Sequence, residues 1–284
     1  MNYSREEIIK DIQKTYNRRT YIFDNMAACM DKGLYRQIQE DSVLLLSHPL
    51  LSNFKLLAIA DGMGGLNQGE KASNTTLLEI IRWFETTPIS YYEKELPLYK
   101  EIIKKINEID GRIRRLYSDS GTTLSLAIIT KYNSQLINIG DSRIYLSNDK
   151  SFFQISEDHS LTWNMYKNSE ITKEMIRFHK QNNLITSKIG GEKKNLIIDN
   201  KIIQNDEYNK LILFSDGVTD CLSEETIEKI INDDNIPLEI KVELVINKAL
   251  YTKSINNYLD TENYYNIING GKDNASVAIY KKLK

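Results

Sequence analysis

Apolar residues follow two different periods along the chain. Short unbroken apolar runs are typical of buried strands, whereas apolar residues that recur every three or four positions are typical of amphipathic helices. The second pattern predicts helices over residues 4–16, 69–85, 99–116, 223–231 and 237–250. The first pattern predicts strands over residues 42–47, 54–60, 124–129, 135–139, 143–146, 151–155, 196–203, 210–214 and 275–280.

The order of these elements indicates the fold class. The first two strands are expected to form a hairpin, the next two helices to be antiparallel neighbours, and the strands of residues 124–155 to form an antiparallel meander. Residues 161–192 are expected to form a partly helical insertion, and the Asn- and Tyr-rich residues 252–271 a long surface loop. Because strands and helices come in separate runs, we expect an α+β fold in one domain, with antiparallel sheets and helices packed outside.

Composition narrows the class of protein. The 284 residues can bury a substantial core, and 37 basic and 39 acidic residues are spread along the chain without a basic block, so nucleic acid is not expected as a partner. Cys29 and Cys221 lie in apolar or strand-adjacent settings, which disfavours a disulfide framework or a thiolate metal site and suits a reducing cytoplasm. No apolar stretch approaches the ~20 residues of a membrane span, so we expect a soluble, cytoplasmic protein without a membrane partner.

Four apolar runs end at, or start from, an aspartate flanked by small residues. These aspartates are Asp61, Asp141, Asp216 and Asp273. Asp-Gly and Gly-Asp pairs are common in turns, so any one of them alone is more often structural. A carboxylate at a strand end lies at the rim of a sheet, however, and several together could gather oxygen ligands around a hard cation. The repeated placement therefore predicts a metal enzyme.

The glycine-rich segment Asp61–Gly65 lies between a predicted strand and a predicted helix, where a nucleotide-binding turn could occur. A dinucleotide fingerprint needs a further glycine where Asn67 stands, and a P-loop needs a Gly-Lys-Ser/Thr sequence that is absent. Two interpretations remain. The glycines allow a backbone path that leaves the Gly62 carbonyl free to face a metal, or they form a structural turn capped by Asp61.

Residues 36–41 bring a guanidinium and two carboxylates to the start of the first predicted strand. Alone, such a group is usually a solvated charge cluster. Beside the strand-end aspartates, Arg36 is suited to bidentate binding of a phosphate, and Glu40 and Asp41 are hard oxygen ligands or orient other ligands. The three histidines lack metal-ligand spacing, and no Gly-x-Ser-x-Gly elbow of a serine hydrolase is present.

Seven short motifs follow one another along the chain: Arg36–Asp41, Asp61–Gly65, Ser120–Thr123, Gly140–Arg143, Asp158–Ser160, Ser215–Gly217 and Asp273–Asn274. Taken in this order, they resemble the metal-dependent protein serine/threonine phosphatases of type 2C, in their bacterial form. The resemblance spans roughly residues 20–284. It implies a four-layer α-β-β-α sandwich, in which helices flank two antiparallel sheets and a binuclear metal site lies at one end. Residues 20–284 would be the catalytic domain with a flap insertion at about 161–195, and residues 1–19 an N-terminal helical extension.

The resemblance also implies a set of metal ligands. Asp61 would bridge two Mn²⁺ or Mg²⁺ ions. Glu40 and the Gly62 carbonyl would complete the shell of one ion, and Asp216 and Asp273 would bind the other.

Further residues receive supporting roles by the same resemblance. Arg36 matches the phosphate-binding arginine of the family, and Asp141 matches an additional, weaker site for a third ion. Asp41 and Asn274 are expected as auxiliary ligands or as residues that support the ligands.

The activity implied is hydrolysis of phosphoserine and phosphothreonine in proteins by a metal-bridging water, without a phosphoenzyme, in opposition to a Ser/Thr kinase. The alternative is a catalytically weak regulatory module that binds a phosphorylated partner. Loss of a metal carboxylate would favour this alternative, and none of Glu40, Asp61, Asp216 and Asp273 is lost. A nucleotide-binding protein is a third reading, and it needs the absent glycine or lysine.

Two positions depart from patterns found in the family. Met63 stands where many animal relatives carry a histidine that is proposed to protonate the leaving alkoxide, so we expect metal-bound water to supply that proton here. Ser187 stands where bacterial relatives often carry an arginine, beside the flap that shapes substrate access. Substrate preference therefore cannot be carried over from relatives.

Overall fold

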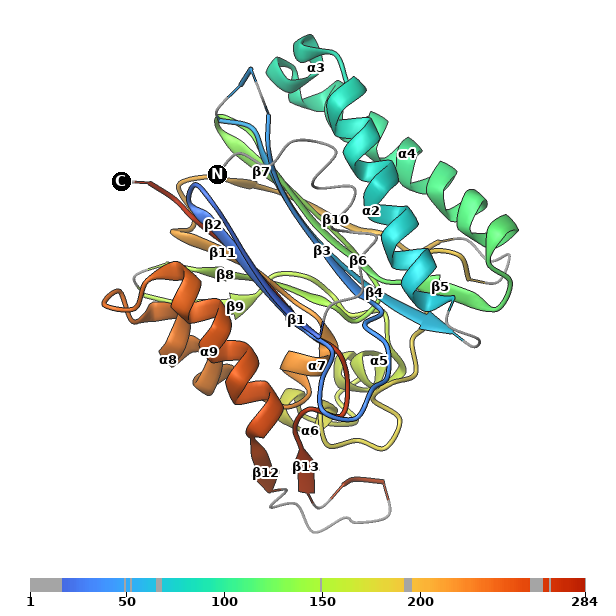
Figure 1. Cartoon of the computed structure of the whole chain (residues 1–284), viewed down its shortest axis with the longest axis vertical. Coiled ribbons are helices and arrows are strands. Elements are labelled where there is room, and N and C mark those ends of the chain that lie inside the picture. Colours follow the sequence, from blue (N-terminus) through green and yellow to red (C-terminus); the bar gives the residue numbers. More distant parts are fainter. Residues whose placement is uncertain are drawn as a thin grey trace.

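The computed structural model describes residues 17–48, 50–51, 53–64, 68–148, 150–191, 196–255, 263–265 and 267–283. In this part of the chain, two large antiparallel sheets pack face to face (Figure 1). The first has the strand order β1-β2-β14-β11-β8-β9, and the second has the order β10-β7-β6-β4-β3 with β5 paired to β4. The strands of the first sheet are β1 (Arg18–Phe23), β2 (Met26–Asp31), β14 (Ala275–Lys281), β11 (Lys210–Phe214), β8 (Arg143–Ser147) and β9 (Phe152–Gln154). Those of the second are β10 (Asp199–Gln204), β7 (Asn133–Ile139), β6 (Leu124–Ile129), β4 (Lys55–Gly64), β3 (Asp41–Ser47) and β5 (Ser120–Thr122).

Helices cover the outer face of each sheet (Figure 1). Helices α2 (Gly69–Thr86) and α4 (Glu95–Leu116) lie over the second sheet, and α8 (Glu224–Asn232) and α9 (Leu238–Tyr251) over the first. Short helices occur in the connections: α3 (Ile89–Glu93), α5 (Leu161–Lys167), α6 (Lys173–Ile176) and α7 (Asp216–Thr219). The predicted α+β fold and its α-β-β-α layers are thus confirmed.

The unbroken apolar runs of the strands follow from burial on both faces. In β4, Leu56 and Ala58 face the helix layer, whereas Leu57 and Ile59 face the other sheet. In β11, Ile212 likewise packs beneath α8 and α9, while its neighbours pack between the sheets. A strand that buries both faces needs apolar residues at consecutive positions, so the usual alternation with polar residues disappears.

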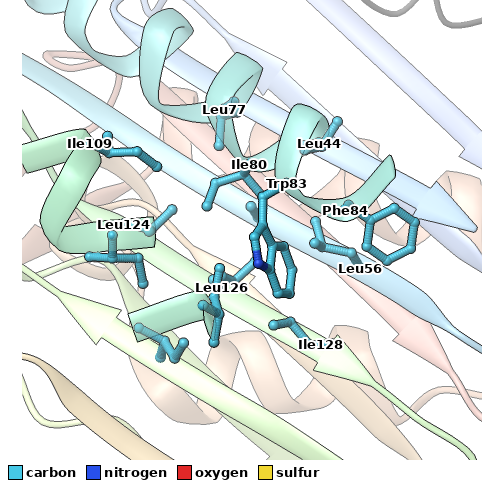
Figure 2. Packing of buried hydrophobic residues seen from close by; sticks show 14 of the residues in the cluster. Leu44, Leu56, Leu77, Ile80, Trp83, Phe84, Ile109, Leu124, Leu126 and Ile128 are labelled. Carbon is cyan, nitrogen blue, oxygen red and sulfur yellow. The ribbon is translucent and has the colours of Figure 1, made fainter. Parts of the chain in front are cut away.

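The largest cluster lies between α2, α4 and the second sheet. Figure 2 shows Leu77, Ile80 and Trp83 of α2 above Leu126 of β6. The two helices are antiparallel, as predicted: Thr75 near the start of α2 contacts Tyr117 just after α4, with 3.0 Å between their hydroxyl oxygens. The helical period was readable in the sequence because this packing requires one apolar stripe on each helix.

The first strand pair of the described chain was not predicted from the sequence. The pair β1 and β2 occupies residues 18–31, with Thr20 opposite Cys29. Every residue of β2 is buried, but its sequence, Met-Ala-Ala-Cys-Met-Asp, is poor in the β-branched and aromatic residues that mark strands. The position of β2 beside β14 in the sheet decides its conformation. Because β1 begins at Arg18, it also overlaps the predicted extension 1–19, whose helix at 4–16 lies outside the described residues.

The predicted meander of residues 124–155 is wrong at its centre. Strands β6 and β7 pair with each other, and so do β8 and β9, but the two pairs belong to different sheets. The chain changes sheets at residues 140–142, where Gly140 has a φ of +97°, a conformation that side chains rarely adopt. Local periodicity cannot distinguish a hairpin from such a crossing.

The predicted surface loop of residues 252–271 contains regular structure. Strands β12 (Lys253–Ile255) and β13 (Ile267–Asn269) form a small antiparallel pair that extends from the end of α9. In Figure 1 this pair lies near α6 and α7, at one end of the sandwich. Among the helices in the described part of the chain, none has both the length and the apolar composition needed to cross a membrane.

Candidate metal centre

The predicted ligand residues meet at one end of the sandwich. Asp41 begins β3 and lies opposite Asp61 of β4 in the register of the second sheet. Asp216 begins α7 directly after β11, and Asp273 lies in the turn before β14, which neighbours β11 in the first sheet. Asp141 lies where the chain crosses between the sheets. The rims of both sheets therefore contribute carboxyl groups to the same region.

Asp61 differs from the expectation in one respect. It lies within β4, which continues to Gly64, and not at the end of a strand. At this point β4 exchanges one partner strand for another, because Ile59 lies opposite Ser125 of β6 and Gly62 lies opposite Thr122 of β5. The local rim of the sheet, rather than the end of the strand, brings Asp61 to the centre.

Electrostatics show how close these carboxyl groups are. Burial, followed by the negative charges of Asp41 and Asp216, raises the pKa of Asp61 well above its usual range. Burial and the charge of Asp273 raise the pKa of Asp216 to about 6, although a hydrogen bond with the Asp61 side chain opposes this shift. Burial raises the pKa of Asp41 to about 7 despite hydrogen bonds from two serines. Such mutual destabilisation of ionised groups is typical of sites that hold cations.

Unpartnered oxygens also suit a cation. One carboxyl oxygen (Oδ1) in each of Asp41, Asp141 and Asp216 is buried and has no hydrogen-bond partner. Buried carboxylate oxygens without protein donors are suitable ligands for hard ions such as Mg²⁺ and Mn²⁺. Within the residues that the structure describes, no three His, Cys, Asp or Glu side chains are arranged as the ligand set of one ion. The aspartates nevertheless fit a metal centre by their chemistry and burial. In this structure Asp273 pairs with Arg36, and the side chains of Asp216 and Asp61 are hydrogen-bonded to each other.

Arg36 lies between two of the predicted ligands. Its Nη2 is 2.6 Å from Oδ2 of Asp273, and its Nη1 is 3.8 Å from Oε2 of Glu40. The guanidinium is about half exposed, so it can reach both the carboxyl cluster and a molecule approaching from solvent. Its fork of donors matches the geometry of a phosphate as well as that of a carboxylate.

Asn274 holds the loop that carries Arg36 and Glu40. Its Oδ1 accepts a hydrogen bond from the Glu40 backbone NH at 2.8 Å, and its Nδ2 donates to the carbonyls of Lys32 and Ile38. Asn274 is 2% exposed. This side chain therefore acts by positioning Glu40, in keeping with the expectation that it supports the ligands.

Gly62 allows a close approach of three backbone segments. A Cβ atom at this position would lie 2.2 Å from the Gly69 carbonyl oxygen and 2.8 Å from that of Glu40. The Gly62 NH donates to the Glu40 carbonyl at 3.1 Å. Glycine is required here for space, which fixes the backbone of Gly62 beside Glu40 and leaves its own carbonyl as a candidate ligand.

Contacts within and between the motifs Ser120–Thr123 and Gly140–Arg143 position Asp61. The Thr123 Oγ1 accepts a hydrogen bond from the Asp61 NH at 2.9 Å and contacts the Ser142 Oγ at 2.8 Å. Thr122 donates its hydroxyl to the Asp61 carbonyl at 2.9 Å. The two threonine hydroxyls thus satisfy the hydrogen-bonding groups of the Asp61 backbone, and together they hold that backbone in place.

Another pair of motifs fixes the crossing that carries Asp141. Arg143 and Asp158 form a buried ion pair, with 2.7 Å between Nη2 and Oδ2. His159 donates its NH to the Gly140 carbonyl at 2.8 Å, and its Nδ1 accepts from the Gly140 NH. His159 is thus a structural residue, which ties the segment before α5 to the strand crossing.

Asp220 was missed by the sequence analysis. Burial and then the charge of Asp216 raise its pKa well above the usual range. The Asp220 NH donates to the Asp216 carbonyl at 2.8 Å, one helical turn apart. The spacing of four residues was the available signal, since it places two side chains on one face of a helical turn.

Sequence comparisons identify the family. A profile described as protein phosphatase 2C matches residues 35–236. The chain belongs to the protein phosphatase 2C family. The serine/threonine phosphatase stp of Listeria welshimeri is 30% identical over 260 residues, which cover 89% of this chain and 93% of that protein.

Solved structures of protein phosphatase 2C relatives share the fold. A bacterial serine phosphatase superimposes with a TM-score of 0.73 at 26% identity, covering 91% of this chain and 98% of that chain. The catalytic domain of the serine/threonine phosphatase PstP, solved with two manganese ions, has a TM-score of 0.68 at 25% identity, covering 94% and 99%. The resemblance seen in the sequence is confirmed, and the chain is a metal-dependent protein phosphatase.

Proposed function

We propose that this chain hydrolyses phosphoserine and phosphothreonine in proteins with two divalent cations, Mn²⁺ or Mg²⁺. The proposed ligands are Glu40, Asp61, Asp216, Asp273 and the Gly62 carbonyl. The observation that carries the proposal is the buried carboxyl cluster, whose pKa values are raised by burial and mutual repulsion. A phosphatase relative that holds two manganese ions supports the number of ions.

Two ions at such a site supply Lewis acidity, which activates water near neutral pH and offsets the charge of the phosphoryl group. Asp61 is proposed as the bridging ligand because it interacts electrostatically with the carboxyl groups of Asp216 and Asp273 at once. Asp141 is proposed to hold a third, weaker ion, since its Oδ1 is buried without a partner. Asp41 accepts hydrogen bonds from the hydroxyls of Ser215 and Ser276, and these bonds orient the segment that carries Asp216.

Arg36 is proposed to bind and orient the phosphoryl oxygens. Its ion pair with Asp273 holds the guanidinium at the rim of the carboxyl cluster, where a phosphate can replace one of the two carboxylate contacts. A guanidinium can grip two phosphate oxygens at once, which a lysine ammonium cannot do with the same geometry.

The substrate and setting of the reaction are part of the proposal. Phosphorylated proteins are the expected substrates, in opposition to a Ser/Thr kinase, because relatives are serine/threonine phosphatases. A cytoplasmic location is supported by Cys29 and Cys221, both free and buried. Residues 20–284 are proposed as the catalytic domain, with the flap at about 161–195.

A regulatory module that binds a phosphorylated partner with little turnover remains the alternative from another class. Such a module would keep the fold but would not need every metal ligand. The buried, unpaired carboxyl oxygens favour catalysis, because a binding module gains nothing from keeping them.

The test compares two substrates under three conditions. Hydrolysis of p-nitrophenyl phosphate and of a phosphothreonine peptide is measured with Mn²⁺, with EDTA and with Asp216→Asn. We expect Mn²⁺-dependent release of phosphate that falls at least about a hundredfold in the variant, since even the loss of a residue that only supports a metal ligand typically costs 10- to 100-fold. Asp206→Asn, which replaces an exposed carboxylate in the β10–β11 turn, is the matched control. Activity that persists in EDTA, or binding of the phosphopeptide without turnover, would contradict the proposal.

A further inference from the structure

Backbone hydrogen bonds join two segments that lie outside the proposed metal centre. Residues 177–180 belong to the flap, and residues 263–265 precede β13. The Tyr265 NH donates to the Phe178 carbonyl at 2.7 Å, and the Lys180 NH donates to the Asn263 carbonyl at 2.8 Å. The segment around β12 and β13 therefore supports the flap through backbone hydrogen bonds.

Arg177 fastens the same junction to the helix that begins at Asp216. Its Nη1 donates to the Cys221 carbonyl at 3.2 Å and lies 3.3 Å from the Ser254 Oγ of β12. Ser254 in turn donates to the Cys221 carbonyl at 3.1 Å. These hydrogen bonds hold the flap, β12 and the chain after α7 together, so the fold fixes the positions of the three segments.

These segments enclose a cavity of about 260 Å³ that adjoins the metal centre. Its lining includes the carboxyl groups of Asp216, Asp220 and Asp273 together with Arg177, Tyr265, Ile267 and Lys272. The volume is close to the lower end of the range for ligand sites, ~300–1,000 Å³, which suits one or two side chains rather than a whole cofactor.

Lys272 contributes a positive charge to the lining of this cavity. It is exposed, and in the part of the chain that the structure describes it makes no ion pair. It directly precedes Asp273, whose Oδ2 lies 2.6 Å from Nη2 of Arg36, so Lys272 is next in sequence to a residue of the proposed phosphate site. Ile267 and Tyr265 are 40% and 44% exposed and offer apolar surface beside it.

We propose that this cavity binds the side chain next to the phosphorylated residue of a protein substrate, that Lys272 pairs with an anionic group on that side chain, and that Ile267 contacts its stem. The anionic group is a carboxylate or a second phosphate. This inference rests on the proposed function, because it assigns a substrate preference to the same site. It also gives a role to Tyr265 and Ile267, which lie in the predicted loop of residues 252–271.

The test uses three phosphothreonine peptides that differ only at the flanking residues, which are Glu, Gln or phosphoserine. For the wild type with Mn²⁺, we expect the ratio of kcat/KM between the Glu and Gln peptides to be roughly fivefold, as for a partly exposed ion pair. Lys272→Gln is expected to bring this ratio to one and Lys272→Arg to keep it. Lys272→Glu is expected to invert it, so that the Gln peptide is hydrolysed faster than the Glu peptide. Lys131→Gln, at the β6–β7 turn on the opposite end of the strands, is the matched control and should keep the wild-type ratio.

Binding is measured separately from turnover. Fluorescence anisotropy of the labelled peptides on Asp216→Asn protein, with and without Lys272→Gln, should show the same ratio in Kd. If only the doubly phosphorylated peptide is preferred and loses its advantage in Lys272→Gln, the anionic group is a phosphate. Equal kcat/KM for all three peptides, or ratios that Lys272→Gln leaves intact, would overturn the inference. Absence of any p-nitrophenyl phosphate hydrolysis by the wild type would instead refute the proposed function.

Discussion

Asp216 combines properties that a purely structural carboxylate does not need. One of its oxygens is buried without a partner, and its pKa is raised to about 6 by burial and by Asp273. Both features cost stability, because a buried charge without full pairing is unfavourable. Their presence supports the proposal that Asp216 holds a cation.

Replacing this carboxylate should separate stability from activity. In EDTA, Asp216→Asn is expected to raise the Tm by about 2–4 °C, because it removes one charge from a repelling cluster. The same variant should lose activity at least about a hundredfold with Mn²⁺. Differential scanning calorimetry in EDTA measures the first effect, with Asp206→Asn as the control. A lower Tm for Asp216→Asn in EDTA would mean that its carboxyl group stabilises the fold.

Met63 lies two residues after Asp61, opposite Gly121 in the pairing of β4 and β5. A thioether carries no exchangeable proton, so this side chain cannot protonate a leaving alkoxide. Met63→His is expected to raise kcat on a phosphothreonine peptide about tenfold while changing p-nitrophenyl phosphate hydrolysis little, because an aryl leaving group needs no acid. Parallel steady-state kinetics on the two substrates measure the difference. Equal changes on both substrates would show that leaving-group protonation does not limit turnover.

The sequence predicted the helices and strands whose conformation depends on a local pattern of apolar residues. Helices α2, α4, α8 and α9 were predictable because each presents an apolar stripe to one sheet. Strand β2 was not, because Ala and Met carry little strand preference and only the neighbouring β14 and β1 decide its conformation. The crossing at Gly140 depends on contacts between distant segments, such as the one with His159, which no local window contains.

Some residues of the candidate site could be predicted from the sequence and others could not. Carboxylates were recognisable by residue type and by their place after apolar runs. The supporting contacts were not, since the partners of Asp41 are Ser215 and Ser276, each more than 170 residues away. Side-chain partners of this kind are set by the packing of the two sheets.

One helix end depends on a buried lysine from the next helix. Lys241 of α9 is 1% exposed, and its ammonium donates to the carbonyls of Ile230 and Ile231 at 2.8 and 2.9 Å and also to that of Asp233. The first two carbonyls belong to the last turn of α8, and Asp233 directly follows this helix. Backbone acceptors at a helix end lack helical partners, and a positive charge is favourable there. Lys241 therefore joins α8 to α9.

Removal of this ammonium should weaken the outer helix layer. Lys241→Met keeps the length of the stem but leaves the carbonyls unpaired, and we expect a loss of about 2–3 kcal/mol in the free energy of unfolding. Urea denaturation followed by circular dichroism measures this loss. Lys248→Met, on an exposed position of the same helix, is the control and should change stability by less than about 0.5 kcal/mol. Equal stability of the two variants would contradict the capping role.

For the whole molecule, the carboxyl cluster links stability to pH. Asp41 and Asp216 have ordinary pKa values of 3.8, which the fold raises to about 7 and about 6. Between these limits the folded protein retains protons that the unfolded chain releases. The free energy of unfolding must then fall as pH rises through this range, because the native state binds more protons than the unfolded state. Cation binding opposes this effect, since the ions bind the ionised carboxylates.

The metal-free protein should therefore lose stability from about pH 4 to about pH 7, and Mn²⁺ should restore it most at the upper end of that range. Tm values measured across the range in EDTA and in excess Mn²⁺ test both expectations. The double variant Asp41→Asn with Asp216→Asn should flatten the slope in EDTA, because it removes two of the raised groups. A Tm in EDTA that rises steadily with pH would show that ordinary surface ion pairs, whose carboxylates gain stability on ionisation, outweigh the cluster. A slope that survives in the double variant would assign the effect to other raised groups, of which Asp61, Asp141 and Asp220 are the candidates.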